Sequence, residues 1–539
     1  MSRVPSSTKV WLILGLLVAG HLALRLRLAF GPLSHIDGVT IPDDAYLSLN
    51  VARNIADGLG PLYGLAPTNG FQPLYVFLAV PLFWWFDDLF RPVQAALVFL
   101  SICDAAALVL LLAWLRRLGV RLAGLLVVVA ATMFHPYLIE TALNGLETSL
   151  AFLLLVATFS YADRLTAGPV VAPRRGQAFT LGALLGLALF ARIDAVFVGP
   201  VILAVLLVRI RMQTIRVERI GPSIGWLLVG GTLTYAPWLV YSYVHTGRIY
   251  PISGRAVRHM TLEEVDHAPT FANFYGPFLR NAFGVVWHHQ WLLVVAAAIV
   301  LGGALLPGVR RRAPELSSRL RAAAAPALLG LVLVLAYALF VFAPWYWKRY
   351  FFPAVLPTLL VVGIGADAVW RVLRPRVAAV VCAIAAAAFV VDARFSPSTT
   401  DPAMSQFDTI HAGKDWKFGY MRLGLWAAKH FPEGTRIGAT QSGGLGYFAP
   451  RLTVVNLDGV VNAECFTFVT EGRILDYIRR VRLQFVVGWD ANLLLLHKWQ
   501  RVPAEPLVEH LVDGFAARDG DEPITTFDKP WFVYRVKGN

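Results

Sequence analysis

Long apolar runs separated by short polar segments occupy most of the chain up to about residue 392. Eleven of these runs are close in length to the roughly 20 apolar residues with which a helix crosses a bilayer. They lie near residues 11–29, 93–114, 121–138, 148–162, 178–191, 194–209, 222–243, 289–306, 322–343, 351–370 and 376–392. The pattern therefore predicts a membrane all-α bundle of about eleven transmembrane helices.

One further run, residues 73–86, is short and rich in proline, phenylalanine and tryptophan, and its position decides the topology. If 73–86 does not span and the N-terminus is cytoplasmic, five successive arginine-rich loops lie inside, among them 116–121, 310–321 and 371–376. The positive-inside rule requires this distribution, and a spanning 73–86 would place every one of these loops outside. We therefore expect 73–86 to lie in or dip into the outer interface, with the C-terminus outside.

Composition agrees with a multi-pass protein of the cell (inner) membrane. Of the 539 residues 57% are hydrophobic and only 15% are charged, and the mean hydropathy is +0.60. The net charge of +14 does not indicate nucleic-acid binding, because the basic residues lie in short loops where topology explains them. Cys465 is the one cysteine in the large polar region, so that region has no internal disulfide, and no Cys/His spacing suggests zinc.

Two polar segments on the predicted outer side are long enough to carry function. In the first outer loop, 30–92, residues 45–57 have helical period and predict an amphipathic helix on the outer membrane surface. After about residue 393, short apolar strands alternate with helical stretches such as 471–481, which predicts a small α/β domain. We expect two domains: a transmembrane domain over 1–392 and an extracytoplasmic α/β domain over 393–539.

Carboxylates on the predicted outer side are the first candidates for chemistry. Asp43 and Asp44 stand side by side just before the predicted surface helix. Helix capping explains one aspartate well and two less well. Asn144 and Glu147 lie in a short outer turn, 135–148, where a cap and a simple Asn-Gly turn are the alternatives.

Basic residues on the same side are candidates for an anionic ligand. Arg255 and Arg258 belong to a polar outer segment, 245–259. Lys348 and Arg349 enter a predicted transmembrane helix from the outside, against the usual charge preference. An anionic ligand is one reason to break that preference.

Other charges lie close to or inside the membrane. Arg192 and Asp194 form an outer turn for which a structural role and a functional one stay equally open. Arg25 and Arg27, at the outer end of the first helix, either reach the headgroups or face a phosphate. Asp104 lies inside an apolar run, so it is either functional or a hydrogen-bond acceptor inside the bundle.

Together these groups suit the transfer of a sugar from a phosphate. A carboxylate can remove the proton of an acceptor hydroxyl, and cations or a metal can stabilise the departing phosphate. Nucleotide sugars are not expected outside the cell. An outward-facing site therefore implies a donor that has crossed the membrane on a lipid, such as a polyprenyl phosphate.

Several motifs resemble the GT-C superfamily of polyprenyl-phosphate-sugar glycosyltransferases, nearest to its bacterial arabinofuranosyltransferase and lipid A sugar transferase branch. They are Asp43-Asp44-Ala45-Tyr46, TNGFQPLY at 68–75, NGLET at 144–148, PISGR at 251–255, KRYF at 348–351, and QSGGLGYF with VVNLDGVVN in the tail. The likeness covers nearly the whole chain. It indicates the superfamily and the branch but not the sugar.

The resemblance implies roles for particular residues. Asp43 would be the catalytic base, and Asp44 would support it or bind a metal. The sugar or acceptor would be bound by Glu147, Asn144, Asn69 and Gln72, and the donor phosphate by Arg255, Arg258, Lys348 and Arg349. Some members of the superfamily need a divalent cation and others do not, so the resemblance leaves this cofactor open.

The expected activity is therefore inverting transfer of a hexose or pentose from a polyprenyl-phosphate donor to a cell-envelope glycan or lipid acceptor, with membrane lipids as further partners. A transporter or lipid flippase is the alternative. It would predict two similar halves and polar residues deep in the bundle. The two halves of the chain are not alike, and its polar residues gather at the outer edge, which favours the enzyme.

Overall fold

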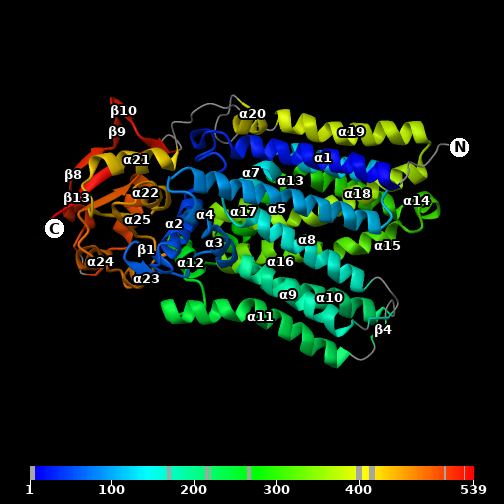
Figure 1. Ribbon diagram of the computed structural model, residues 1–539, viewed down its shortest axis with the longest axis horizontal. Helices are drawn as coiled ribbons and strands as arrows, with labels where there is room; N and C mark the ends of the chain where they lie inside the picture. Colours follow the sequence, from blue (N-terminus) through cyan, green and yellow to red (C-terminus); the bar gives the residue numbers. More distant parts are fainter. Residues whose placement is uncertain are drawn as a thin grey trace.

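The computed structural model describes residues 7–166, 170–171, 173–212, 216–217, 220–263, 269–395, 404–411, 419–502, 505–526 and 529–538. Figure 1 shows long helices running side by side, with the C-terminal domain at one end of the bundle and the N-terminus at the other. The multi-pass helical membrane domain and the C-terminal strand-containing domain expected from the sequence are both confirmed.

Nine helices of the described residues are long and apolar enough to cross a membrane, or ten if a bent pair counts as one span. Each of the eleven apolar runs forms a helix. The helices of the bundle are α1 (Ser7–Ala29), α5 (Arg91–Arg117), α6 (Leu122–Phe134), α7 (Pro136–Ala142), α8 (Thr148–Leu165), α9 (Arg175–Ala191), α10 (Val198–Arg211), α11 (Ile220–Thr246), α13 (Gly276–Leu305), α16 (Ala324–Ala336), α18 (Val355–Val372) and α19 (Pro375–Phe395).

Two of the runs account for the difference between eleven and nine. The run 121–138 is broken at His135, where α6 and α7 meet at 63°, because Pro136 cannot donate the hydrogen bond that would continue α6. Helix α9 has 17 residues, about 26 Å at 1.5 Å per residue, and is slightly short for a bilayer core of about 30 Å. It packs along α11 over much of its length.

The run 73–86 does not form a long helix, in agreement with the prediction. It is divided into α3 (Pro73–Ala79) and α4 (Leu82–Trp85), which lie beside α2 at the end of the bundle that carries the C-terminal domain (Figure 1). Trp84 and Trp85 are 65% and 73% exposed, as is typical of aromatic side chains at a membrane interface.

The helix predicted over 45–57 forms as α2 (Asp43–Ala56), and its position on the outer membrane surface stays a prediction. Both of its faces are buried: Leu47 and Val51 on one side and Tyr46 on the other. It packs against α22 (Gly443–Phe448) of the C-terminal domain. Its polar face therefore meets a second domain instead of water or headgroups.

The C-terminal domain is built on a five-stranded sheet in the order β6-β5-β7-β13-β8. Strands β5 (Arg436–Ala439), β6 (Thr453–Asn456) and β7 (Phe485–Gly488) are parallel to one another. Strand β13 (Phe532–Val536) is antiparallel to both of its neighbours, β7 and β8 (Leu511–Ala516). Its helices are α21 (Tyr420–His430), α22, α23 (Ala463–Thr470), α24 (Ile474–Arg480) and α25 (Asp490–Lys498). The strands and the α/β class match the sequence pattern.

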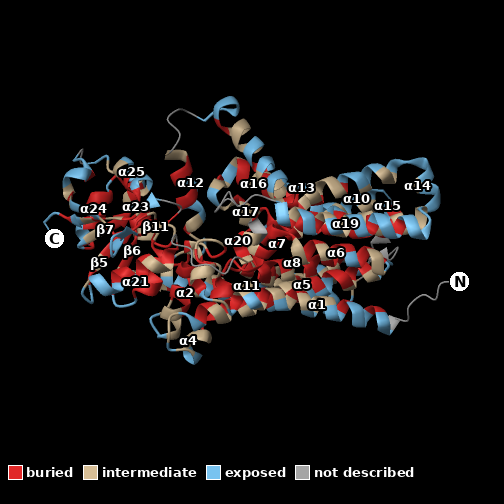
Figure 2. Cartoon of the chain, turned by 90° about the horizontal axis from the view of Figure 1, so that it is seen from above, coloured by how far each residue is buried: buried red, intermediate tan, exposed pale blue. Residues whose placement is uncertain are grey.

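The first outer loop and the C-terminal domain share one hydrophobic core. Ala45, Leu49 and Val76 of the loop belong to the same buried cluster as Leu445 and Trp531 of the domain, and Figure 2 shows buried residues continuing from α2 into α21. The last bundle helix, α19, ends at Phe395, and residues 396–403 lie outside the described residues. The division at 392/393 into two domains stays a prediction.

Candidate functional site

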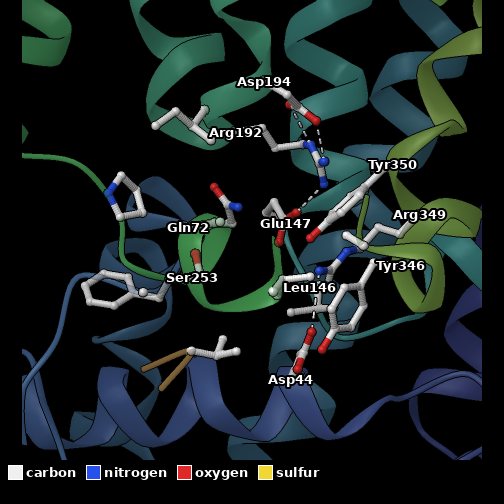
Figure 3. Close-up of a pocket in the computed structure, with 18 of the residues that line it drawn as sticks. Asp44, Gln72, Leu146, Glu147, Arg192, Asp194, Ser253, Tyr346, Arg349 and Tyr350 are labelled. Carbon is white, nitrogen blue, oxygen red and sulfur yellow. Dashed lines mark hydrogen bonds and ion pairs between the residues drawn. The ribbon is translucent and has the colours of Figure 1, made fainter. Parts of the chain in front are cut away.

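A pocket of about 240 Å³ lies where the bundle, the first outer loop and the C-terminal domain meet (Figure 3). Its charged and aromatic lining comes from five separate parts of the chain. These residues are Asp44, Phe71, Glu147, Arg192, Asp194, Tyr250, Tyr337, Tyr346, Arg349 and Tyr350. Among them are three carboxylates and two guanidinium groups, with Gln72 and Ser253 as smaller polar neighbours.

Asp44 points into this pocket from the first turn of α2. Pro42 is the cap residue of that helix and no side chain caps it, so neither aspartate serves as the cap. A carboxylate oxygen of Asp44 lies 3.5 Å from a terminal nitrogen of Arg349. Burial raises the pKa of Asp44, Arg349 lowers it, and the charge of Glu147 raises it. The balance is a raised pKa, which suits a general base.

Asp43 points the other way, into the C-terminal domain. Its two carboxylate oxygens accept hydrogen bonds from the backbone N–H groups of Gly443 and Gly444, each at 2.8 Å. Burial raises the pKa of Asp43 to about 7. Asp43 does not line the pocket, and both of its oxygens are already engaged. Of the two aspartates, Asp44 is therefore the one whose carboxylate is available to a ligand in the pocket.

Glu147 stands at the cap position of α8 and is 1% exposed. Its Oε1 accepts a 2.6 Å hydrogen bond from Arg192. Its Oε2 is buried and has no hydrogen-bond partner among the described residues. A buried carboxylate oxygen without a partner costs free energy. Since Glu147 lines the pocket, a ligand that donates a hydrogen bond would remove that cost.

Arg192 and Asp194 hold Glu147 in place. Arg192 is 4% exposed. Two of its nitrogens donate hydrogen bonds to Asp194, at 3.0 and 2.5 Å, and the third donates to Glu147. Asp194 also accepts a 2.9 Å hydrogen bond from the Tyr337 hydroxyl. The sequence marked this turn as structural or functional without deciding. The structure places both residues in the pocket lining, next to Glu147.

Arg349 is presented by a break between two bundle helices. The segment Tyr337–Val341 ends in Phe342 and Ala343, which have φ values of 71° and 28°. Non-glycine residues seldom adopt such values, and they cluster at functional sites. The chain then re-enters through α17 (Trp347–Tyr350). The Arg349 guanidinium lies 5.2 Å from the ring centres of Tyr346 and Tyr350, and its Nε has no partner among the described residues.

Of the other predicted sugar-binding residues, one lines the pocket and two do not. Gln72 lines the pocket beside Gly70. Asn69 is buried, and its amide nitrogen donates to Ser242 and to the carbonyl of Tyr250, so it ties the first outer loop to the segment after α11. Asn144 bonds the Thr148 hydroxyl and closes its own turn. Asn69 and Asn144 thus shape the site from outside the pocket lining.

Three of the predicted phosphate-binding residues lie outside the pocket lining. Arg255 and Arg258, on α12 (Ser253–Glu263), are exposed and stack on Phe466 and Phe342. Lys348 pairs with Glu140. Arg349 is the one member of the predicted phosphate set that lines the pocket.

The remaining intramembrane charges pair with each other. Arg25 is 1% exposed, donates to Asp104 at 3.3 Å and also reaches the carbonyls of Thr132 and Met133. His21 lies 2.7 Å from the same carboxylate. The expectation that Arg25 reaches the headgroups or a phosphate is therefore wrong. Asp104 is a hydrogen-bond acceptor inside the bundle, which is the structural one of its two predicted roles.

No group of three or more His, Cys, Asp or Glu side chains in the described part of the chain could hold a metal ion. Asp44 and Glu147 line the same pocket, but the Oε1 of Glu147 is already held by Arg192. The described residues around Asp44 therefore do not form a metal site from protein ligands alone.

Solved structures share the overall fold of this chain. ArnT from Cupriavidus metallidurans bound to undecaprenyl phosphate is 13% identical, with a TM-score of 0.55 and 98% of both chains covered. Its apo form gives 12% and 0.58 over 98% of both chains. An Archaeoglobus fulgidus oligosaccharyltransferase in the apo form is 12% identical, with a TM-score of 0.55 over 95% of this chain and 75% of that one.

In the sequence comparisons, a domain of unknown function (DUF8728) matches residues 409–533, and no curated protein matches. The structural likeness extends over nearly the whole chain, through the bundle, the first outer loop and the C-terminal domain. The chain therefore has the fold of these solved proteins, which is the fold that the resemblance to the GT-C superfamily led us to expect.

Proposed function

We propose that the protein is an inverting glycosyltransferase that moves a hexose or pentose from a polyprenyl-phosphate donor to a cell-envelope glycan or lipid. One observation carries this proposal. Among the residues that the structure describes, the pocket lining contains a buried donor without a partner, the Nε of Arg349, and a buried acceptor without a partner, the Oε2 of Glu147. A glycosyl phosphate offers the complement of both: phosphate oxygens for the guanidinium and sugar hydroxyls for the carboxylate.

Asp44 is the base in this mechanism. Its carboxylate takes the proton of the acceptor hydroxyl, and that oxygen attacks the anomeric carbon from the face opposite the phosphate. The bond between the anomeric carbon and the phosphate oxygen breaks. Its electron pair leaves with the polyprenyl phosphate, whose charge Arg349 stabilises. Glu147 orients the sugar through a hydroxyl, and the product linkage has the inverted configuration.

The location follows from charge and from the fold. The arginines of helices α14 (Pro307–Arg312) and α15 (Leu316–Leu320) belong to the end of the bundle opposite the C-terminal domain (Figure 1). The positive-inside rule assigns that end to the cytoplasm. The pocket and the C-terminal domain then lie outside the inner membrane, where a sugar arrives on a lipid. Undecaprenyl phosphate bound to the similarly folded ArnT agrees with a polyprenyl carrier.

The test is sugar transfer by the full chain in nanodiscs, supplied with a panel of polyprenyl-phosphate pentoses and hexoses and an envelope glycan acceptor. With the donor that is used, we expect Asp44→Asn to lower kcat by about 10²–10⁴ while donor binding persists. Asp43→Asn is the matched control, since it removes the neighbouring charge outside the pocket. We expect it to retain more activity than Asp44→Asn.

A different result would refute the assignment. If Asp43→Asn abolishes transfer and Asp44→Asn does not, the base is Asp43 and the pocket has been assigned to the wrong carboxylate. If no donor is used and Asp44→Asn leaves the envelope of the producing cell unchanged, the transporter or flippase alternative replaces the enzyme.

A further inference from the structure

The charges that line the pocket are out of balance. Asp44, Glu147 and Asp194 supply three carboxylates, whereas Arg192 and Arg349 supply two cations. Arg192 is saturated, because its nitrogens are held by Asp194 and Glu147. Arg349 is therefore the one cation of the described lining that can receive a ligand anion, and the donor phosphate takes it in the proposed function.

The free oxygen of Glu147 has a fixed position. Arg192 anchors Oε1, and Asp194 and Tyr337 in turn anchor Arg192. The Arg192 guanidinium also lies 5.2 Å from the centre of the Tyr350 ring. With Glu147 only 1% exposed, its carboxylate cannot turn away from a ligand to reach water. Whatever part of the sugar meets Oε2 must donate a hydrogen bond to it.

We propose that the transferred sugar carries no acid group and that Glu147 enforces this selection, an inference that rests on the proposed function. The carboxylate of a uronic acid would lie in a buried pocket beside Glu147 with no uncommitted cation to pair with it. Like charges placed together without compensation exclude the wrong partner. Arg255 and Arg258 cannot compensate from the pocket lining, because they lie outside it.

Arg192 and Asp194 are positioning residues in this scheme. They act on the sugar through Glu147, whose Oε2 is buried without a partner among the described residues. Asp194→Asn keeps the shape of the side chain but weakens its hold on Arg192. It should therefore reduce the preference for a neutral sugar, and a merely structural residue would not change that preference.

The experiment compares matched polyprenyl-phosphate donors that differ only at the acid group: glucose with glucuronic acid and galactose with galacturonic acid, together with neutral pentoses. For wild type, we expect transfer from at least one neutral donor. We expect the kcat/KM of every uronic acid donor to be lower than that of its neutral counterpart by a factor of about 10² or more. In Glu147→Gln, we expect the neutral donor to be used less well and the gap to its acid counterpart to shrink at least about tenfold. Glu263→Gln, on α12 outside the pocket lining, should leave the gap unchanged.

The outcomes separate the two proposals. Transfer from a uronic acid donor as efficient as from the best neutral one overturns the inference and leaves the glycosyltransferase standing. The Glu147→Gln variant must first match wild type in monodispersity and thermal unfolding. If its difference in kcat/KM between neutral and acid donors is then the same as in wild type, Glu147 does not select the sugar. If Glu147→Gln does not fold, the wild-type donor comparison still decides. Failure with every donor refutes the proposed function itself.

Discussion

Asp43 and Asp44 are adjacent in the sequence, but their side chains point to different parts of the molecule. A helix places consecutive side chains about 100° apart, so one carboxylate enters the C-terminal domain and its neighbour enters the pocket. The sequence showed that a pair of carboxylates at this place is unusual. It could not assign the roles, because the partners of Asp43 are the backbone N–H groups of Gly443 and Gly444, which no side-chain pattern reveals.

A pH dependence of stability follows from the buried aspartates at this junction. Asp37, which accepts from Tyr46 and from the Met421 N–H, and Asp43 both have a pKa raised to about 7 from an ordinary 3.8, mainly by burial. The folded protein therefore holds these protons more tightly than the unfolded chain. The free energy of unfolding should fall as pH rises from about 4 to about 7, by at most about 1.4 kcal/mol per pH unit for each group.

Thermal unfolding in nanodiscs between pH 4 and pH 8 measures this slope. The double variant Asp37→Asn/Asp43→Asn, which cannot titrate at either position, should flatten it. A wild-type midpoint that rises over this range would contradict the raised pKa values.

At the scale of elements, periodicity located the helices and strands but not what their polar faces meet. The apolar runs became bundle helices, and segments such as 436–439 and 453–456 became strands. Helix α2 has the amphipathic pattern of a surface helix, yet Arg53 donates to the carbonyls of Tyr447 and Gly446. A polar face looks the same in the sequence whether it contacts water or a second domain, so this docking required the structure.

Gly443, the first residue of α22, lies against the backbone of the first outer loop. A Cβ added at Gly443 would lie 2.1 Å from the backbone oxygen of Asp43. Gly443→Ala should therefore separate the two parts and lower stability by roughly 1–3 kcal/mol, the usual cost of overpacking. Because α2 also carries Asp44, transfer activity should fall as well.

Thermal unfolding and transfer assays of the same preparations check this prediction. Gly284→Ala, at a position inside α13 with open space around it, is the control and should lower neither quantity. Full activity in Gly443→Ala would show that α2 does not depend on this contact.

For the whole molecule, charge is divided between two ends. At the end with the pocket, the carboxylates of Asp44, Glu147 and Asp194 line one cavity. At the opposite end, buried Asp367 accepts from Arg319 at 2.8 Å and Arg371 at 2.9 Å. Basic loops on one side were readable from the sequence. The buried carboxylate that compensates them was not, because Asp367 lies within an apolar run whose helical neighbours are unknown until the helices pack.

Asp367→Asn would leave Arg319 and Arg371 without their shared buried partner. Removing one member of a buried ion pair typically costs about 3–5 kcal/mol, so we expect a marked fall in the thermal unfolding midpoint. The surviving folded protein should keep its donor preference, because Asp367 does not line the pocket. Glu315→Gln, where the carboxylate is 64% exposed, should have a much smaller effect. Equal losses in the two variants would contradict this account.

The contact between Asp43 and Gly443 also bears on how such chains can evolve. The two residues are 400 positions apart, yet the contact constrains both. The backbone oxygen of Asp43 leaves no room for a side chain at position 443, and the N–H groups of Gly443 and Gly444 need an acceptor at position 43. In related chains that keep this contact, position 443 should remain glycine and position 43 should remain a hydrogen-bond acceptor. A C-terminal domain exchanged between relatives should function only when the first outer loop is inherited with it.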